Sequence, residues 1–228
     1  MNTAGQFSII PIPIFNVKIF LVQTPAGFIL IDSGIPLQEK RINHALYKLG
    51  INPGDIKLIL LTHGHLDHIG CLEFLKRISG AELVCHHSLT QVLEGGSYEE
   101  AIPRTAGWKL FNSSVSRILA GGLKPVQPDY DYQDRFDLSK VGINGEMIHT
   151  PGHSPGSSSI YLEGGICFLG DLLREPSPGK YDTGLFYHDR DQILSSLELI
   201  SALKPALIFL SHGTTMSGSE LTKFLQNN

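Results

Sequence analysis

Three histidines and one aspartate lie close together in the stretch from Thr62 to His68, which reads Thr-His-Gly-His-Leu-Asp-His. Imidazole nitrogens and carboxylate oxygens are the donors with which proteins bind zinc and similar divalent cations. Buried without a partner, the same groups would carry a large desolvation penalty, which a bound cation removes. The spacing therefore predicts a metal site.

The sequence around these residues places them between a strand and a helix. Residues 56–61 form an apolar run typical of a buried strand, and residues 69–78 have the spacing of an amphipathic helix. At the carboxyl end of a strand in an α/β protein, polar side chains line a crevice. We expect the donors to face such a crevice.

Three later predicted strands are each followed by one further donor. His153 lies in a loop rich in proline and glycine, Asp171 follows the strand at 165–169, and His212 follows the strand at 206–210. Polar residues often close strands, so each placement alone says little. Their repetition favours one shared site, and two cations would need these additional donors.

Two sets of strands with flanking helices make up the rest of the chain. Strands are predicted at 7–14, 18–23, 27–31, 56–61, 82–86, 146–150, 157–162, 165–169 and 206–210, and helices at 36–49, 69–78, 189–203 and 217–225. This order suggests a four-layer sandwich within a single domain, residues 1–228. Residues 88–133 are irregular, apart from a helical piece at 108–119, and are predicted to cover the site.

Composition narrows the range of partners. The formal net charge is -4 and no basic run occurs, which argues against nucleic-acid binding. No apolar stretch approaches the roughly 20 residues of a membrane span, and the first residues carry no basic leader. The three cysteines form no closely spaced pair and are expected to be reduced. We expect a cytoplasmic protein that acts on a small molecule.

The pattern H-x-H-x-D-H with a later His, Asp and His resembles the metallo-β-lactamase superfamily. The residues that carry the resemblance are His63, His65, Asp67, His68, His153, Asp171 and His212. It implies an α/β fold, the four-layer αββα sandwich, with two divalent metal ions at the open edge of the strands. The ions would be zinc in most members and iron or manganese in some.

The resemblance also implies a division of the donors. His63, His65 and His153 would bind the first ion, and Asp67, His68 and His212 the second, with Asp171 bridging the two. Asp32, in the turn that the family places behind the cluster, would hydrogen-bond a ligand histidine.

Two such cations roughly 3.5 to 4 Å apart can share a water and lower its pKa toward neutrality. The expected reaction is attack by this bridging hydroxide on a thioester or another carboxylic ester of a small molecule. Asp67 and Asp171 are the predicted catalytic residues because both would bind the ions. In having Asp171, Asp67 and His68, the chain resembles the glyoxalase II-like branch of the superfamily.

Three alternatives remain open: an acyl-homoserine-type lactonase, a phosphodiesterase similar to RNase Z, and a metal-binding sensor without turnover. Arg174 stands where the lactonases have a tyrosine, and the chain ends soon after His212, where glyoxalase II continues into a glutathione-binding domain. Lys180 has a spacing similar to that of the glutathione-binding lysine of glyoxalase II. Further candidates for the substrate pocket are Arg174, Tyr187, Trp108, Phe111 and Phe186.

Overall fold

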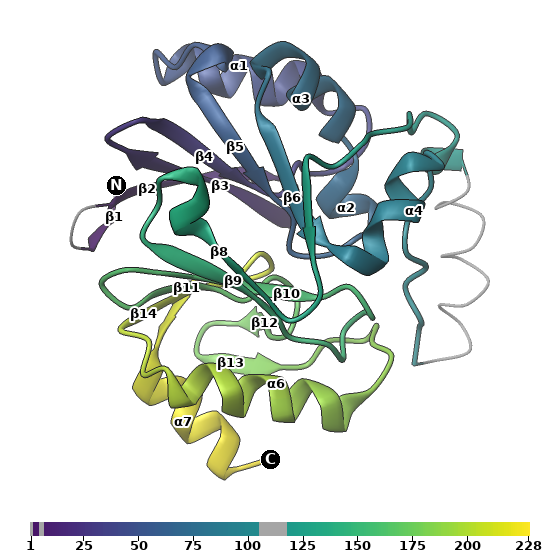
Figure 1. Ribbon diagram of the computed structural model, residues 1–228. Helices are drawn as coiled ribbons and strands as arrows, with labels where there is room; N and C mark the ends of the chain where they lie inside the picture. The colour runs from purple at the N-terminus through teal and green to yellow at the C-terminus, as the bar shows by residue number, and fades with distance from the viewer. Residues whose placement is uncertain (1, 5–6, 105–117) are drawn as a thin grey trace.

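A computed structural model describes residues 7–104 and 118–228, together with the backbone of residues 2–4, and shows four layers (Figure 1). Two β-sheets pack face to face in the middle. Helices α1 (Glu39–Lys48) and α3 (Leu72–Ser79) cover the outer face of the first sheet. Helices α6 (Arg190–Ala202) and α7 (Gly218–Gln226) cover the outer face of the second. The predicted αββα sandwich is confirmed.

The first sheet has strand order β1-β2-β3-β4-β5-β6-β7 and the second has order β15-β14-β11-β10-β9-β8. The first sheet consists of β1 (Asn2–Ala4), β2 (Phe7–Ile14), β3 (Val17–Thr24), β4 (Gly27–Ile31), β5 (Ile56–Leu60), β6 (Glu82–His86) and β7 (Tyr130–Tyr132). The second consists of β8 (Arg135–Asp137), β9 (Gly145–His149), β10 (Ser158–Leu162), β11 (Ile166–Phe168), β14 (Leu207–Phe209) and β15 (Thr215–Ser217). Strands β12 (Arg174–Ser177) and β13 (Lys180–Asp182) pair as a separate hairpin, and the short helices are η1 (Pro53–Asp55), α2 (Leu66–Ile69), η2 (His87–Leu89), α4 (Thr90–Glu94) and η3 (Leu138–Val141).

Alternating apolar residues explain why each sheet is covered on both faces. Along β3, Ile19 and Leu21 pack toward the helices, whereas Phe20 packs between the sheets. There its ring centroid lies 5.2 Å from that of Phe168 and 5.6 Å from that of Phe209, two residues of the second sheet. Because neighbouring residues of a strand point to opposite faces, an almost wholly apolar strand must lie between two hydrophobic layers.

Parallel pairing brings the functional ends of several strands to one edge. Strands β4, β5, β6 and β7 are parallel neighbours in the first sheet, and β11 is parallel to β14 in the second. The carboxyl ends of parallel strands meet at the same edge of a sheet, which is where α/β proteins place their sites. The predicted donors after β5, β11 and β14 therefore lie at one end of the sandwich.

Two predicted helices differ from those in the structure. The helix expected at 36–49 begins at Glu39, because Leu37 has a φ of 67°, outside the helical region. The helix expected at 69–78 is divided into α2 and α3. At this division Gly70 packs so closely on Pro36 that a Cβ on Gly70 would lie 2.1 Å from the Pro36 nitrogen.

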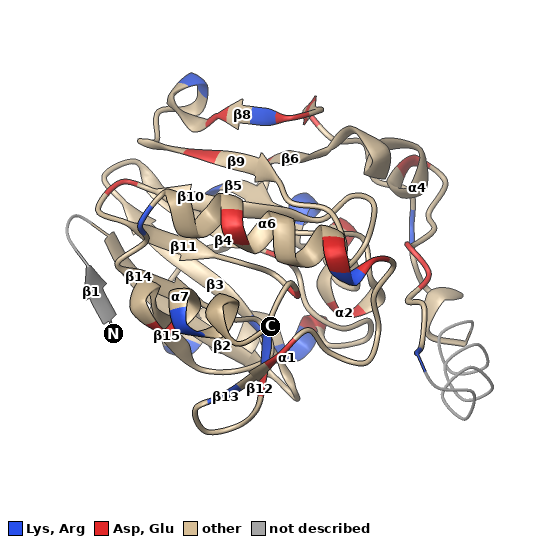
Figure 2. Cartoon of the chain, turned by 90° about the horizontal axis from the view of Figure 1, so that it is seen from below, with Lys and Arg blue, Asp and Glu red and all other residues tan. Residues whose placement is uncertain are grey.

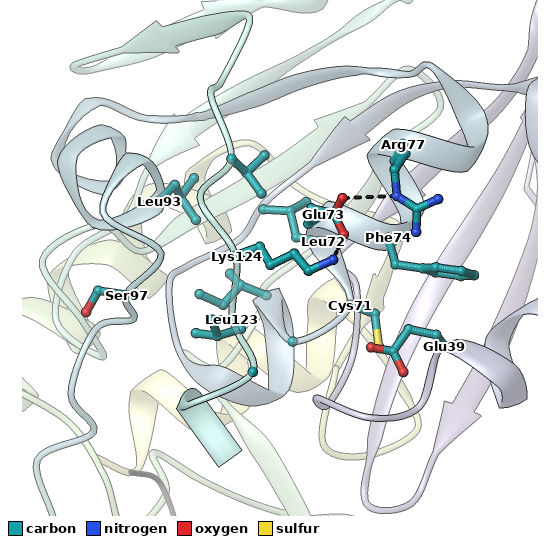
Figure 3. Close-up of a pocket in the computed structure, with 14 residues that line it drawn as sticks. Glu39, Cys71, Leu72, Glu73, Phe74, Arg77, Leu93, Ser97, Leu123 and Lys124 are labelled. Carbon is teal, nitrogen blue, oxygen red and sulfur yellow. Dashed lines mark hydrogen bonds and ion pairs between the residues drawn. The ribbon is translucent and has the colours of Figure 1, made fainter. Parts of the chain in front are cut away.

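The segment expected to cover the site, residues 88–133, begins with α4 and ends in β7, which pairs with β6. Its predicted helix at 108–119 lies mainly outside the described residues. After the gap, the segment returns to α3, where Leu123 and Leu93 pack on Leu72 around a cavity of about 210 Å³ (Figure 3). Apolar contacts therefore hold both described parts of the segment against the first sheet's helices.

Charged side chains of both signs are mixed over the elements seen in Figure 2, as the small net charge of -4 leads one to expect. Among the described residues, no helix has the length and apolar character needed to cross a membrane.

Candidate metal centre

All seven predicted donors gather at the open edge of the sandwich in two groups. The first group is His63, His65 and His153, and the second is Asp67, His68, Asp171 and His212; within each group the ligand atoms lie within 4.8 Å of one another. The first histidines follow β5, and the later donors come from the β9–β10 loop and from the ends of β11 and β14. Strands from both sheets thus contribute to one site.

The first group consists of three buried imidazoles. Nδ1 of His65 lies 3.1 Å from Nε2 of His63 and 2.9 Å from Nε2 of His153. The rings meet nearly edge to face, with an interplanar angle of 82° between His63 and His65. Three converging imidazole nitrogens are a common zinc arrangement that leaves a fourth position open for water or substrate.

The second group contains both carboxylates. Nε2 of His212 lies 3.2 Å from Oδ2 of Asp67 and 3.3 Å from Oδ2 of Asp171. Nε2 of His68 lies 3.3 Å from Oδ1 of Asp171. Asp171 also faces the first group, because its Oδ2 lies 3.6 Å from Nε2 of His153. This carboxylate occupies the position between the two groups that the bridging prediction requires.

Asp32 organises two of the histidines from behind. Its Oδ2 accepts hydrogen bonds from Nδ1 of His68 (2.8 Å) and from the Thr62 hydroxyl (2.7 Å), and its Oδ1 accepts one from the Thr62 backbone N–H (2.8 Å). The Thr62 oxygen in turn lies 3.0 Å from Nδ1 of His63, which donates to it. The Nε2 lone pairs of His63 and His68 are therefore left to face the site.

The predicted hydrogen bond from Asp32 to a ligand histidine is thus present, and Thr62 is a functional residue that the sequence reasoning did not single out. The available signal was its hydroxyl, placed directly before the first histidine. Backbone geometry supports this arrangement. Asp32 has a φ of 60°, which aspartate tolerates better than most residues. Gly170 has a φ of 57°, and a Cβ there would lie 2.8 Å from Cβ of Thr62.

Orphaned polar atoms show that this donor set fits a divalent cation. Among the described residues, the buried side-chain nitrogens and oxygens without a hydrogen-bond partner all belong to the cluster. They are His65 Nε2, His68 Nε2, His153 Nδ1 and Asp171 Oδ1. Buried polar groups are normally paired, and an exception calls for an explanation such as a bound ion. His68 Nε2 and Asp171 Oδ1 carry this fit, because they face each other at 3.3 Å across the second group, as two ligands of one cation would. His65 Nε2 and His153 Nδ1 lie on the far side of their rings from the nitrogens that converge in the first group.

Burial and neighbouring charges separate the two groups electrostatically. Burial lowers the pKa of His65 to about 4 and that of His153 to about 3, so the first group is neutral. In the second group, burial opposes ionisation of His212, but Asp171 and Asp67 raise its pKa to about 10. Burial likewise opposes ionisation of Asp171, yet His212 and His68 hold its pKa well below the usual value. The second group therefore presents ionised carboxylates to a cation.

A cavity of about 460 Å³ is lined by five of the donors, His65, Asp67, His153, Asp171 and His212. Its walls are largely apolar: Ile35, Leu66, Leu119, Leu185 and Phe186 all line it. Phe186 is therefore where the sequence predicted it, whereas Trp108 and Phe111 lie outside the described residues. A pocket of this kind suits a small organic group more than a polymer.

The three residues predicted to contact substrate lie in different positions relative to the cavity. Arg174 lines the cavity, but its guanidinium is bound to the Asp182 carboxylate, with Nε 2.6 Å from Oδ1 and Nη2 3.2 Å from Oδ2. Lys180 is exposed on β13 and does not line the cavity. Tyr187 also lies outside it, half-buried against the apolar cluster that contains the buried residues of α6, with the guanidinium of Arg104 4.7 Å from its ring centroid. The prediction that Lys180 and Tyr187 contact substrate is not supported by this geometry.

Replacing Asp32 by Asn tests the hydrogen bonds behind the histidines. Asn tolerates the left-handed backbone of this position, but one carbonyl oxygen cannot replace the three bonds that the carboxylate accepts. We expect Asp32→Asn to weaken metal binding by about 10- to 100-fold, measured by competition with a chromogenic chelator. The control is Asp55→Asn, which replaces an exposed carboxylate on η1. Equal metal affinities in Asp32→Asn and the control would contradict the assignment.

A four-layer α/β fold with histidine and aspartate donors at the strand ends defines a class of divalent-metal-binding proteins. The family model described as "Metallo-beta-lactamase superfamily" matches residues 12–212, and the chain belongs to that superfamily. Its members are metal-dependent hydrolases. The donor groups described above identify this chain as one that uses divalent metal.

Relatives of similar length share part of the sequence. The chain is 28% identical over 221 residues to hydroxyacylglutathione hydrolase GloC of Haemophilus influenzae, covering 94% of each chain. It is 26% identical over 236 residues to the probable metallo-hydrolase YflN of Bacillus subtilis, covering 90% of this chain and 85% of that one.

Solved structures show the same architecture. A metallo-beta-lactamase family protein from Thermus thermophilus has a TM-score of 0.69 at 22% identity, covering 97% of this chain and 79% of that one. The B3 metallo-beta-lactamase BLEG-1 has a TM-score of 0.67 at 22% identity, covering 96% of this chain and 99% of that one.

Proposed function

We propose that this protein is a binuclear metal-dependent hydrolase that cleaves a thioester, or another carboxylic ester, of a small molecule. The observation that carries the proposal is the position of Asp171, whose carboxylate lies 3.3 Å from His212 of one donor group and 3.6 Å from His153 of the other. A carboxylate shared by two groups of ligands is the arrangement expected of a two-metal site.

The donors form two sets of metal ligands. His63, His65 and His153 would hold one cation, while Asp67, His68 and His212 would hold the other, with Asp171 between them. Two bound divalent cations supply Lewis acidity and lower the pKa of a coordinated water, so the reaction needs no strong side-chain base. Without metal, burial opposes ionisation of Asp67 and Asp171, but the charged imidazoles of His68 and His212 hold the pKa values of both carboxyls low. A bound cation would replace the protons of these two histidines and keep both carboxylates ionised.

The cavity supports an acyl compound as the substrate. Leu66, Leu185 and Phe186 would contact the organic part, and the ester or thioester carbonyl would lie over the donors that line the cavity. A relative that spans 94% of this chain is a hydroxyacylglutathione hydrolase by name, and that name describes a thioesterase. This likeness supports placing the chain in the glyoxalase II-like branch.

Zinc is the proposed metal, because imidazole and carboxylate donors suit it, although the same donors also bind iron and manganese. We further propose a cytoplasmic location and a small-molecule substrate, with no nucleic-acid or membrane partner. The free, buried state of Cys71, Cys85 and Cys167 agrees with a reducing compartment.

A substrate panel on the metal-loaded protein tests the reaction class. The panel contains a hydroxyacyl thioester of glutathione, simple acyl thioesters, lactones and bis-p-nitrophenyl phosphate. We expect kcat/KM for the best thioester to exceed that for the phosphodiester by at least about 100-fold, a difference of roughly 3 kcal/mol in transition-state stabilisation. Higher activity on a lactone would favour the lactonase alternative. Activity on the phosphodiester alone, or full metal loading without turnover, would overturn the proposal.

A further inference from the structure

Glu99, a residue with no assigned role, holds a central position beside the first donor group. It follows α4 in the segment predicted to cover the site, and it is one of the residues that line the cavity over the donors. Its Oε2 accepts hydrogen bonds from the Gly64 backbone N–H at 2.8 Å and from the Ser154 hydroxyl at 2.6 Å. Its Oε1 accepts one from the Gly156 backbone N–H at 3.0 Å.

These partners belong to two loops that come from different sheets. Gly64 separates His63 from His65 in the loop after β5 of the first sheet. Ser154 directly follows His153 in the loop between β9 and β10 of the second sheet. The Glu99 carboxylate therefore joins the two loops that together present the three imidazoles of the first group.

A backbone contact strengthens the same connection. The Glu99 N–H donates to the Gly64 carbonyl at 2.8 Å, so Glu99 binds Gly64 through both backbone and side chain. Gly64 must be glycine for this approach, because a Cβ there would lie 2.9 Å from Cγ of Glu99. Gly156 is equally close to its surroundings, with a Cβ position 2.6 Å from Cδ2 of Leu89. Glu99 thus occupies space that Gly64 leaves for it, and Leu89 occupies the space that Gly156 leaves.

The other donor group is anchored elsewhere. His68 is held by Asp32, and Nδ1 of His212 donates to the Asn16 carbonyl at 2.9 Å. By contrast, Nδ1 of His153 and Nε2 of His65 are buried without a partner, so their rings have no hydrogen bond of their own on the outer side. The orientation of these two rings depends on the loops that carry them, and Glu99 fixes those loops.

We propose that Glu99 is a positioning residue that sets the geometry of the His63–His65–His153 site and thereby the metal affinity of that site alone. The inference rests on the proposed two-metal function. All three hydrogen bonds that its carboxylate accepts come from the loops, so Glu99, although it also lines the cavity, acts on the histidines through these loops. It also makes the first donor group dependent on the covering segment, from which Glu99 comes.

The test compares Glu99→Ala and Glu99→Gln with Glu100→Ala, which removes the neighbouring exposed carboxylate. Zinc is titrated against a chromogenic chelator, and the stoichiometry is measured by elemental analysis. We expect Glu99→Ala to weaken one of the two zinc equivalents by about 10- to 100-fold and to leave the other unchanged. Glu99→Gln, which retains one acceptor oxygen, should show a smaller loss. Glu100→Ala should match the parent protein.

Two further backgrounds identify the affected site. In the His153→Ala variant, the zinc ion that remains tightly bound belongs to the second group. Adding Glu99→Ala to this variant should change the affinity for that ion by less than about 2-fold. In the His212→Ala variant, the zinc ion that remains bound belongs to the first group. Adding Glu99→Ala to this variant should weaken the binding of that ion by the same factor of about 10 to 100. Equal loss in both backgrounds, or in neither, would overturn the inference.

Failure of the wider proposal gives a different result. A parent protein that binds fewer than two zinc equivalents contradicts the binuclear function itself. A parent with two equivalents and a Glu99→Ala variant that titrates identically contradicts only the role of Glu99. The melting temperature of each metal-free variant is the folding check, and Glu99→Gln provides the comparison if the alanine variant does not fold.

Discussion

Replacing Asp171 by Asn is expected to lower kcat/KM by at least about 10³-fold and to weaken both metal equivalents together. Asn has nearly the shape of Asp but carries no charge and offers one acceptor oxygen in place of two. In the folded protein, Asp171 Oδ1 faces His68 while its Oδ2 lies near both His212 and His153. No other carboxylate among the described donors faces both groups, so the loss should reach both ions.

Two comparison variants, Asp67→Asn and Asp134→Asn, test whether the loss of both ions is specific to Asp171. Asp67 contacts only the second group, so its replacement should weaken one equivalent and spare the other. Asp134 is an exposed carboxylate between β7 and β8, and its replacement should change neither activity nor metal content. Elemental analysis after dialysis against a graded chelator series provides the measurement. Loss of a single equivalent in Asp171→Asn would contradict a shared carboxylate.

Six of the seven donors could be found from the sequence because they follow strands with a strong apolar pattern; His153, in the loop after β9, is the exception. Strand β5 is apolar enough to be recognised on its own, and His63 and His65 come directly after it. Strands β11 and β14 are similarly apolar, and they are followed by Asp171 and His212. Periodicity fixes where a strand ends, and the fold then brings these ends to one edge.

The short elements could not be found in this way. Strands β7, β8, β12, β13 and β15 each contain only three or four residues. Strands β11 and β14 are as short but are wholly apolar, whereas these five contain polar residues and are too short to show the alternation that identifies a strand. Pairing with a neighbour decides their conformation. The β12–β13 hairpin matters most for the site, because it pairs Arg174 with Asp182 and carries Lys180 away from the cavity.

Roles that depend on contacts between distant residues were also hidden from the sequence. Thr62 and Asp32 are 30 residues apart, yet their hydrogen bond determines which nitrogen of His63 faces the site. Glu99 lies 55 residues from Ser154, in a segment without a clear pattern. Neither contact leaves a periodic signal, since each depends on how the two sheets pack. The sequence therefore predicted the seven donors that gather at the edge and, through the family resemblance, Asp32, but neither Thr62 nor Glu99.

Removing the metal is expected to abolish turnover, by at least about 10³-fold, and to lower the melting temperature by about 10 °C. The stability loss follows from linkage: a ligand present at about 1,000 times its Kd stabilises the folded state by about 4 kcal/mol, and 1 kcal/mol corresponds to roughly 2 to 4 °C in a chain of this size. Without the cations, the buried donors without partners, among them His68 Nε2 and Asp171 Oδ1, remain unpaired. The measurement is thermal unfolding and thioester hydrolysis before and after chelation.

Controls separate the loss of metal from other effects of the chelator. Chelator already saturated with zinc should change neither the melting temperature nor the rate of thioester hydrolysis. Adding zinc, manganese or ferrous iron singly to the stripped protein should show which ion restores turnover. His153→Ala, which lacks a donor of the first group, should lose less stability on chelation because only one full site remains to be emptied. A stripped protein that keeps both its melting temperature and its activity would show that the buried cluster is a structural hydrogen-bonded core. In that case the unpaired nitrogens and oxygens at the open edge would need an explanation other than a bound cation.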